Sequence, residues 1–325
     1  MQQHPMAQFH QMLDAILKTG IRRPNRTGID TYFLPGYMLR FDLANEGFPA
    51  ITTKKLAFKS MVGELLGFFR GYQWAHEFRS IGSKVWDQNA NETASWLASE
   101  FRAGHDHIGR VYGSQWTDWR DWRHTQDAEV AQRLKESGYE VIVEVDSEQH
   151  NGPAWVLRKG INQLEVALRN ILTDPTSRRI IVNGWRPDEH DQGALPACHV
   201  AYQFLVDPVN KELHMTLWQR SFDSFLAFNI SEGALFLEIM ARLTGLKAKT
   251  FSHFVSDVHL YVDHVEQVRE LLSRDHFDQP TLVISDRVKA VSLEEIPGVF
   301  TRIEPDDFEL KDYRHHAAIK ATMAA

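Results

Sequence analysis

The chain has 325 residues, of which 43% are hydrophobic and 24% are charged, and its net charge is −7 at pH 7. This composition is typical of a globular protein with a large core. The acidic balance argues against nucleic acid or an anionic membrane as a partner. An anionic substrate therefore has to be bound by arginines placed locally.

The cysteine usage and the N-terminal segment indicate the compartment. Cys198 is the single cysteine, which excludes an internal disulfide and fits a reducing environment. The first ten residues lack the basic and apolar regions of a signal peptide, and no apolar run is long enough to cross a bilayer. We expect a cytoplasmic protein, in the cytoplasm of a host if a phage encodes it.

The first predicted elements are a helix, a pair of strands and a buried helix. Residues 6–20 have apolar residues at helical spacing and end in a glycine, which predicts a helix. Residues 31–43 are interpreted as strand, turn and strand. Residues 60–71 are apolar nearly all round, which predicts a buried helix and makes Glu64 within it unusual.

The middle of the chain, residues 118–160, is polar and predicts a short helix and a short hairpin. We interpret it as a small inserted lobe in a single domain of residues 1–325. Residues 161–174 then form a clear amphipathic helix.

The remaining elements are strands in a run, followed by long helices. Strands are predicted at 178–185, 199–207 and 212–220, and helices at 230–245 and 257–274. No regular alternation of strand and helix appears, so the pattern favours an α+β fold over a doubly wound sheet. Neither a G-x-G-x-x-G fingerprint nor a P-loop is present, so nothing supports a nucleotide cofactor of those types.

The stretch "ALPACHVAYQF" raises the question of what Cys198 does. A lone cysteine near a strand is about as often core packing as chemistry. Arginines shortly before and after it favour chemistry, because a cationic neighbour stabilises the thiolate. Arg220 is placed to do this and to bind an anion.

Three further arginines are candidates for phosphate binding. Arg178 and Arg179 follow "TDPTS", which fits either a solvated turn or a clamp whose guanidinium forks match phosphate oxygens. Arg26 in "NRTG" stands in a turn that contains glycine.

Acidic and aromatic residues supply other candidates. Glu64 is either a paired structural carboxylate or a carboxyl with a raised pKa that is suited to proton transfer. In "DVHLY", Asp257, His259 and Tyr261 share one face if the segment is a strand, whereas Asp257 is a cap if a helix begins there. No metal is expected, because the histidines at 105–107 and 315–316 lack second ligand pairs at zinc spacing.

These pieces in this order resemble the thymidylate synthase family, from "NRTG" at 25–28 to the end of the chain, with an interruption at 118–160. The matching motifs in chain order are "GFPAITTKKLAFKSMVGELLGF", "VWDQNANE", "GRVYGSQW", "DPTSRRIIVNGW", "LPACH", "QRSFD", "FN", "DVHLY" and "YRHHAAIKATMAA". The resemblance implies a large mixed sheet packed with long helices. It also implies a homodimer formed through a face of that sheet, and the insertion is similar to a lobe that some bacterial members carry.

The resemblance also implies a chemistry. Cys198 would attack C6 of dUMP, and C5 would then take a one-carbon unit from the co-substrate 5,10-methylenetetrahydrofolate. Asn229 would contact O4 and N3 of uracil through one donor and one acceptor. The relatives that act on deoxycytidylate have an aspartate there, so Asn229 favours dUMP over dCMP.

The remaining implied roles divide among the phosphate, the sugar, the proton transfers and the folate. The 5′-phosphate would be held by Arg26, Arg220 and Ser221 together with Arg178 and Arg179 of the partner subunit. The deoxyribose 3′-hydroxyl would contact His259 and Tyr261. Glu64 would order water for proton transfers, with His199 and Tyr112 supporting the thiol and the base. Trp86 and Asp223 would face the folate, under a C-terminal tail ending at Ala325. Arg220 and Asp223 would also take part in catalysis.

Departures from the family pattern gather near the folate and the thiol. "SFLAFN" lacks two residues before Asn229, together with the usual glycine and proline. Ala197 replaces a proline, Ser256 a glycine, Ala325 a bulkier aliphatic residue and Asn89 a tryptophan.

A loosened folate pocket lets water attack the methylene at C5, because hydride transfer requires a closely held folate and excluded water. The sequence therefore leans toward a dUMP hydroxymethylase that makes 5-hydroxymethyl-dUMP. The alternative is a thymidylate synthase that makes dTMP and dihydrofolate. A third hypothesis is a non-catalytic nucleotide-binding relative.

Overall fold

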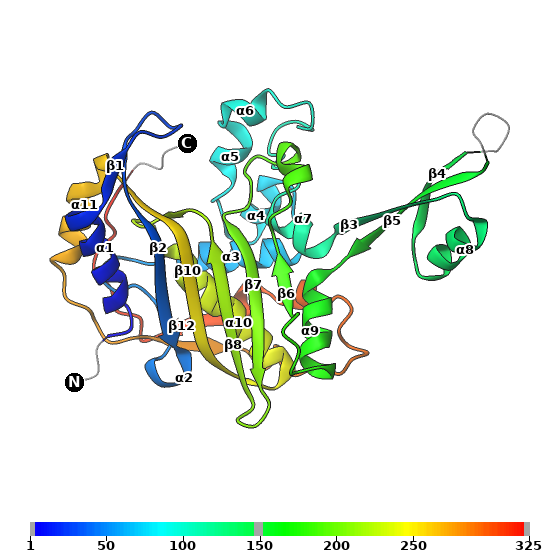
Figure 1. Ribbon diagram of the computed structural model, residues 1–325. Helices are drawn as coiled ribbons and strands as arrows, with labels where there is room; N and C mark the ends of the chain where they lie inside the picture. Colours follow the sequence, from blue (N-terminus) through cyan, green and yellow to red (C-terminus); the bar gives the residue numbers. More distant parts are fainter. Residues whose placement is uncertain (1–3, 146–151, 322–325) are drawn as a thin grey trace.

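A mixed sheet organises the chain in the computed structural model, which describes residues 4–145 and 152–321. The strand order is β1–β2–β10–β8–β7–β6, with the short β9 paired to β10 (Figure 1). Most neighbours are antiparallel, but β10 runs parallel to β8 and β9, so the predicted α+β class with a large mixed sheet is confirmed. The strands are β1 (Ile21–Arg23), β2 (Thr31–Asp42), β6 (Ile181–Asn183), β7 (His199–Asp207), β8 (Glu212–Gln219), β9 (Phe222–Asp223) and β10 (Lys247–Tyr261).

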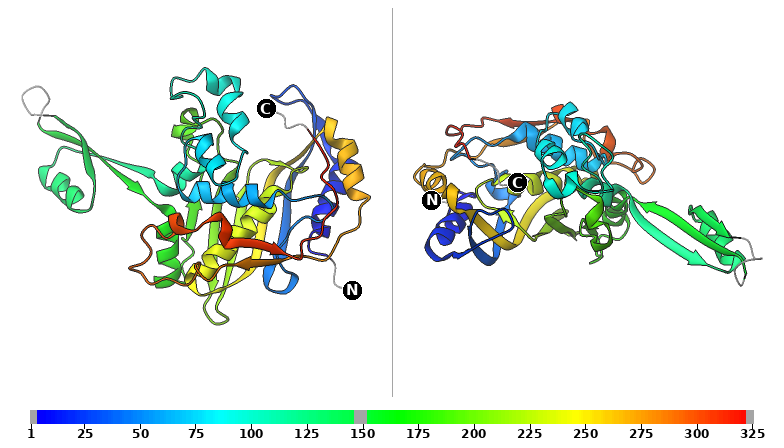
Figure 2. Two further views of the ribbon diagram at one scale, coloured as in Figure 1. Left: turned by 180° about the vertical axis from the view of Figure 1, so that it is seen from behind. Right: turned by 90° about the horizontal axis from the view of Figure 1, so that it is seen from above.

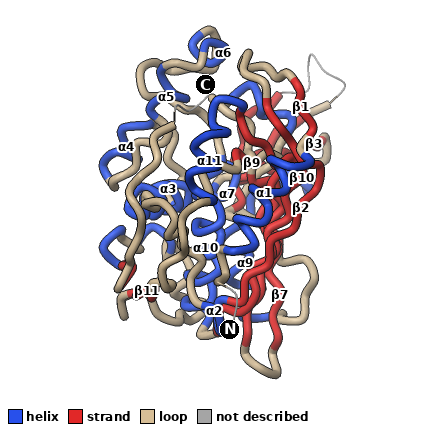
Figure 3. Tube along the Cα trace, turned by 90° about the vertical axis from the view of Figure 1, so that its left-hand side faces the viewer, coloured by secondary structure: helices blue, strands red, loops and turns tan. Residues whose placement is uncertain are grey.

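Helices cover one face of this sheet and leave the other face open (Figures 2 and 3). The two central helices are α3 (Phe58–Phe69) and α10 (Phe228–Thr244), which pack on each other. Both are buried nearly all round, as their apolar sequences predict, and α10 ends at Gly245 in a left-handed conformation with φ 69°. The other α-helices outside the inserted segment are α1 (Ala7–Thr19), α2 (Leu43–Glu46), α4 (Ala75–Ser80), α5 (Asp87–Asn91), α6 (Ala94–Leu97), α7 (Tyr112–Thr117), α9 (Gln163–Thr173) and α11 (Val265–Leu272).

Two predicted boundaries are wrong. Residues 31–43 do not turn: β2 continues through Pro35 and Gly36 in register with β10, with Gly36 at φ 68°. Residues 257–274 are not one helix, because β10 extends to Tyr261 and α11 begins only at Val265. In both places pairing with a distant strand decides the conformation, and such pairing is invisible to local periodicity.

The inserted segment forms a lobe that projects from the main body (Figures 1 and 2). It contains β3 (Trp119–Thr125), α8 (Ala128–Glu136), β4 (Glu140–Val145) and β5 (Ala154–Ile161), with the strand order β3–β5–β4. Its own small core consists of Ala131, Trp155 and Leu157. The predicted helix and hairpin are present, and β3 is a third strand that the sequence did not indicate.

The remaining elements lie near the C-terminal end of the chain. Strands β11 (Thr281–Ile284) and β12 (Phe308–Lys311) form a separate two-stranded sheet. Within residues 4–145 and 152–321, no helix combines the length and the apolar character that crossing a membrane requires.

Candidate active site

One cavity of about 670 Å³ brings together residues from distant parts of the chain. Its walls come from the start of β7, the ends of β8 and β10, the first turn of α10, the start of α7 and the turn at residues 25–28. Ten of the predicted site residues line it: Arg26, Tyr112, Cys198, His199, Arg220, Ser221, Asp223, Asn229, His259 and Tyr261.

Cys198 is half-buried at the start of β7, and two neighbours fix its position. Its backbone N–H donates to the Tyr112 hydroxyl at 2.7 Å. Arg220 places Nη2 3.7 Å from the sulfur, while its guanidinium also donates to the carbonyls of Pro196 and Ala197 at 2.8 and 2.9 Å. A guanidinium held this way stabilises a thiolate, and the thiolate is the form that attacks.

Asn229 stands in the first turn of α10 with its amide held at both ends. Gln219 donates to Oδ1 at 3.2 Å, and Nδ2 donates to Glu232 at 3.3 Å. Gln219 is itself fixed, because it donates to the Ser221 carbonyl at 2.8 Å and lies 2.8 Å from His253 Nε2. This arrangement leaves the amide one further N–H and one further lone pair for a ligand.

Two predicted residues lie behind the cavity rather than on its wall. Glu64 is buried in α3, where burial and the nearby Glu232 carboxyl raise its pKa well above the ordinary value. Trp86 is buried against Phe68 and Tyr112, and its ring does not line the cavity.

The strand β10 carries the sugar-side candidates. "DVHLY" is a strand, so His259 and Tyr261 both face the cavity, and Asp257 lies 3.4 Å from His259 Nδ1. Burial raises the pKa of Tyr261, which keeps its hydroxyl neutral. Burial alone would raise the pKa of Asp257, but hydrogen bonds from His259 and Arg23 lower it below its ordinary value.

The predicted folate side holds a buried acid and a buried base. Burial raises the pKa of Asp223, and burial lowers the pKa of Lys54 to about 8. In the segment before Asn229, Ala227 adopts a left-handed φ of 57°, which is uncommon for a residue other than glycine.

Three predicted residues do not join this cavity. Arg178 and Arg179 are exposed just before β6 and are not among the residues that line it. Ala325 lies outside the described residues. Among residues 4–145 and 152–321, no group of three or more histidine, cysteine, aspartate or glutamate side chains is placed to hold a metal ion.

Comparison with known proteins shows to which family this chain belongs. A family model described as thymidylate synthase matches residues 7–325. The chain is 43% identical over 325 residues to the thymidylate synthase of Pseudomonas syringae pv. tomato, which covers 98% of this chain and all of that protein. The chain belongs to the thymidylate synthase family. It is therefore a one-carbon transferase of that superfamily, as the motifs predicted.

Other thymidylate synthases match over similar lengths. The protein of Pseudomonas putida is 44% identical over 326 residues, covering 98% of this chain and all of the relative. "Thymidylate synthase 1/2" of Encephalitozoon cuniculi is 32% identical over 324 residues, covering 99% of this chain and 98% of the relative. These names favour the dTMP-forming alternative over the hydroxymethylase toward which the sequence leaned.

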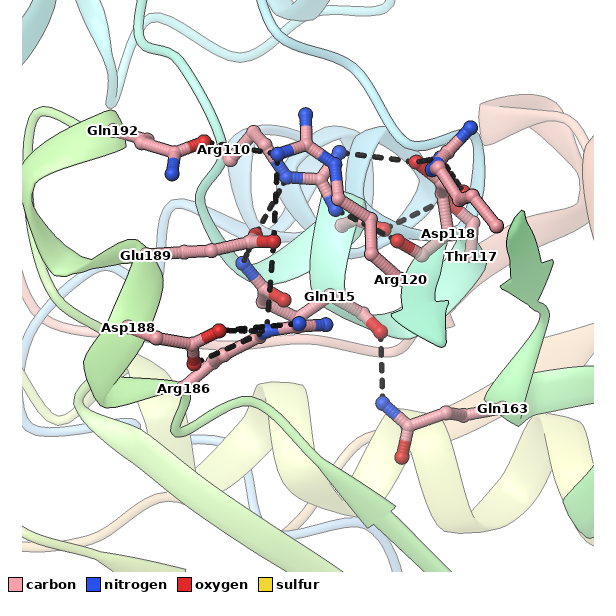
Figure 4. Close-up of polar contacts among 12 residues, drawn as sticks. Arg110, Gln115, Thr117, Asp118, Arg120, Gln163, Arg186, Asp188, Glu189 and Gln192 are labelled. Atoms are coloured by element: carbon pink, nitrogen blue, oxygen red, sulfur yellow. Dashed lines mark hydrogen bonds and ion pairs between the residues drawn. The ribbon is translucent and has the colours of Figure 1, made fainter. Parts of the chain in front are cut away.

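A cluster of charged residues, largely buried, connects the inserted lobe to the loop that carries the thiol (Figure 4). Glu189, in the segment before Cys198, accepts from Arg110 Nε at 2.6 Å and lies 3.4 Å from Arg186 Nε. Arg110 also donates to Asp118, where the lobe begins, at 3.0 Å. We call Arg110, Asp118, Arg186 and Glu189 the arginine–glutamate cluster.

The sequence analysis missed two buried polar residues of the site. Glu232 is a charged residue within an apolar helix, the same signal that singled out Glu64, but it was not recognised. Gln219 gave no signal, because a glutamine at the end of a strand is usually exposed, whereas here it is buried.

Proposed function

We propose that this chain is a thymidylate synthase that converts dUMP and 5,10-methylenetetrahydrofolate to dTMP and dihydrofolate. The observation that carries the proposal is Cys198 beside Arg220 in a cavity that also holds Asn229, in a chain matched by the family over residues 7–325. The relatives' names over the full length support dTMP rather than 5-hydroxymethyl-dUMP as the product.

The first step follows from the thiol and the arginine. As the Cys198 sulfur bonds to C6 of uracil, the C5=C6 π bond breaks and its electrons move toward O4. The Arg220 cation, 3.7 Å from the sulfur, favours the thiolate needed for this addition. The electron-rich C5 then bonds to the one-carbon unit as the bond from that carbon to folate N10 breaks. C5 next loses its proton and the bond to folate N5 breaks, which leaves an exocyclic methylene; hydride addition to this methylene expels the Cys198 sulfur from C6. The folate supplies both that carbon and the hydride that completes the methyl group.

Recognition of the nucleotide divides into a base contact and a phosphate contact. The free N–H and lone pair of Asn229 match O4 and the N3–H of uracil. Arg26, Arg220 and Ser221 surround the same cavity and supply cationic and hydroxyl donors for the 5′-phosphate. His259 and Tyr261 are proposed to bind the 3′-hydroxyl.

The folate is proposed to lie beside Asp223, Trp86 and the C-terminal tail. The fit rests on the cavity volume of about 670 Å³ and on the walls that Leu226 and Asp223 add beside the nucleotide donors. Glu64, with the support of Tyr112 and His199, is proposed to serve the proton transfers at O4 and C5.

The functional unit is proposed to be a homodimer formed through the open face of the sheet, with each chain a single domain carrying the 118–160 lobe. Trp218 and Met38 are 47% and 53% exposed there, and Phe254 lies between them in the strand register. A row of exposed apolar side chains on a sheet face is typical of an interface. Arg178 and Arg179 would reach the partner's phosphate site.

One assay tests the product. The protein is incubated with dUMP and methylenetetrahydrofolate, the nucleotide is identified by mass, and dihydrofolate is followed by absorbance. We expect dTMP and dihydrofolate in equal amounts, and none with Cys198→Ala. 5-Hydroxymethyl-dUMP without dihydrofolate would overturn this proposal in favour of the hydroxymethylase, and no turnover of any nucleotide would favour a binding protein.

A mixing experiment tests the shared sites. Arg178→Glu and Cys198→Ala chains should each be inactive alone and regain activity when mixed. A mixed dimer would contain one site with both an intact thiol and an intact partner arginine. A monomer by sedimentation, or no recovery on mixing, would contradict the dimer.

A further inference from the structure

Glu232 is a buried carboxyl one helical turn after Asn229, behind the cavity wall. It is 1% exposed and does not line the cavity. One oxygen accepts from Asn229 Nδ2 at 3.3 Å, and the other has no hydrogen-bond partner within the described part of the chain. Burying a carboxylate without a partner is costly, so the protonated form of the group is favoured.

The groups that face Glu232 offer it no cation. Glu64 faces it from α3, and His199 and Tyr202 face it from β7, with His199 Nδ1 at 4.0 Å. Burial lowers the pKa of His199 to about 3 and raises the pKa of Tyr202, so both stay neutral. No lysine or arginine among residues 4–145 and 152–321 forms an ion pair with Glu64 or Glu232.

The two carboxyls therefore cannot both ionise without placing two unscreened charges in one apolar site. Burial raises the pKa of both groups, and the charge of Glu232 raises the pKa of Glu64 further. We call Glu64 and Glu232 the carboxyl pair. At neutral pH the pair therefore retains at least one proton beside the residue that contacts the base.

Glu232 also helps to orient the Asn229 amide, and this orientation decides which base Asn229 can bind through hydrogen bonds. The Asn229 amide accepts from Gln219 and donates to Glu232, and Gln219 is oriented by the Ser221 backbone carbonyl, which cannot change its role. The free N–H and lone pair then match uracil, whereas a flipped amide would match cytosine.

We propose that Glu232 is a positioning residue of the reaction: with Glu64 it keeps a proton in the carboxyl pair, and it holds Asn229 in the orientation that contacts uracil. The inference rests on the proposed function for its substrate. A proton of the pair goes to O4, through water, as the Cys198–C6 bond forms. It leaves O4 again as C5 bonds to the one-carbon unit, where the folate nitrogen released from that carbon accepts a proton, and the pair takes up the proton that later leaves C5. The proton count of the pair is restored over one turnover.

The test compares Glu232→Gln with Glu64→Gln and with Glu238→Gln as a matched control. The glutamine at 232 keeps an oxygen for Asn229 but removes the second titrating carboxyl. Glu238 lies on the same helix, and burial raises its pKa to about 7, yet it does not line the cavity.

The first readout is the infrared carbonyl band of protonated carboxyls, titrated on the protein without ligands. We expect a band that persists through neutral pH in the wild type. Either single substitution in the carboxyl pair should move the midpoint of the remaining group to lower pH by about one unit or more. In Glu238→Gln the titration of the pair should be unchanged. Both carboxyls ionised at neutral pH in the wild type would overturn the proposal.

The second readout is the release of tritium from dUMP labelled at C5, measured against pH. This step is shared by dTMP and 5-hydroxymethyl-dUMP formation, so it does not depend on the product. We expect the alkaline limb of kcat/KM to move to lower pH in Glu232→Gln and to stay in place in Glu238→Gln. A uniformly lower rate with the wild-type pH profile would show a merely structural role. If the wild type releases no tritium, the proposed function fails while the infrared titration still decides whether the carboxyl pair keeps a proton.

Discussion

Glu189 of the arginine–glutamate cluster and the two carboxyls of the carboxyl pair are all buried, but their charges are treated in opposite ways. Glu189 lies between the guanidinium groups of Arg110 and Arg186. Burial alone would raise the pKa of Glu189, but hydrogen bonds from Arg110 and Gln115 lower it below its ordinary value. Glu64 and Glu232 have no cationic partner among the described residues, and burial raises the pKa of each.

This difference separates a structural site from a chemical one. Paired charges stay ionised over the working pH range and fix the geometry of the loop that leads to Cys198. Unpaired carboxyls hold a proton that a reaction can use. Changing one member of each cluster should therefore affect different properties of the protein.

The largest effect is expected at Glu64. We expect Glu64→Gln to lower kcat by about 10²–10⁴-fold, the usual contribution of a proton-transfer group. The free energy of unfolding should not fall, because the change removes a buried carboxyl without a cationic partner. Steady-state kinetics and urea unfolding measure the two quantities. A loss of stability with unchanged kcat would give Glu64 a structural role like that of Glu189 and contradict its role in proton transfer.

Glu189→Gln should act on stability instead. Removing the charge leaves Arg110 and Arg186 buried without their carboxylate, which costs about 3–5 kcal/mol. Asp188→Asn is the matched control, because Asp188 contacts the same Arg186 at 3.2 Å but is 69% exposed, and it should cost less than about 1 kcal/mol. Equal losses in the two variants would show that burial of the pair is not what matters.

The pH dependence of stability should have opposite signs in the two clusters. Unfolded glutamates ionise near 4.5, whereas the carboxyl pair stays protonated to higher pH in the fold. The native state then binds more protons, so its free energy of unfolding falls as pH rises above 4.5. Glu232→Gln should therefore gain stability relative to the wild type as pH rises.

Glu189 provides the reverse case in the same experiment. Its folded pKa lies below the ordinary 4.5, so its contribution is complete above that pH and is lost as pH falls. The stability deficit of Glu189→Gln should shrink in acid. Unfolding by urea across a pH series, with Glu238→Gln alongside, measures both trends, and parallel curves for the variants at 189 and 232 would contradict the assignment.

The smallest effect is expected at Tyr112, which lines the cavity and contacts the thiol loop through the Cys198 N–H. Tyr112→Phe removes the acceptor for the Cys198 N–H and leaves a buried donor unsatisfied, at a cost of about 1–3 kcal/mol. We expect a modest loss of stability and of kcat with no change in pH profile. A shifted alkaline limb would place Tyr112 with the carboxyl pair rather than with the groups that position the thiol.

Local patterns predicted a large part of this fold. The α1, α3, α9 and α10 helices and strands β6, β7 and β8 follow from apolar spacing and helix-stop glycines. The continuous β2 and the conversion of residues 257–261 into strand could not be predicted this way. Each depends on the pairing of β2 with β10, more than 200 residues apart in the chain.

Some residues of the candidate site could likewise be predicted from the sequence, whereas others could not. Motifs and resemblance identified the thiol, Arg26, Arg220, Asn229 and the histidine and tyrosine of "DVHLY", and these side chains line one cavity. Glu232 carried the same local signal as Glu64, a charge within an apolar helix, but its proximity to Glu64 is visible only in the folded structure. The lean toward hydroxymethylation came from missing residues in one loop, a local feature that says little about the product.

The sequence by itself determined the reacting groups: one thiol, nearby arginines, an amide for the base and a carboxyl inside an apolar helix. Only the tertiary structure decided the state of the charges. It paired Glu189 with arginines and left Glu64 and Glu232 facing each other, and pKa depends on burial and on neighbours in space rather than in sequence. The protonation of this site is therefore a property of the fold.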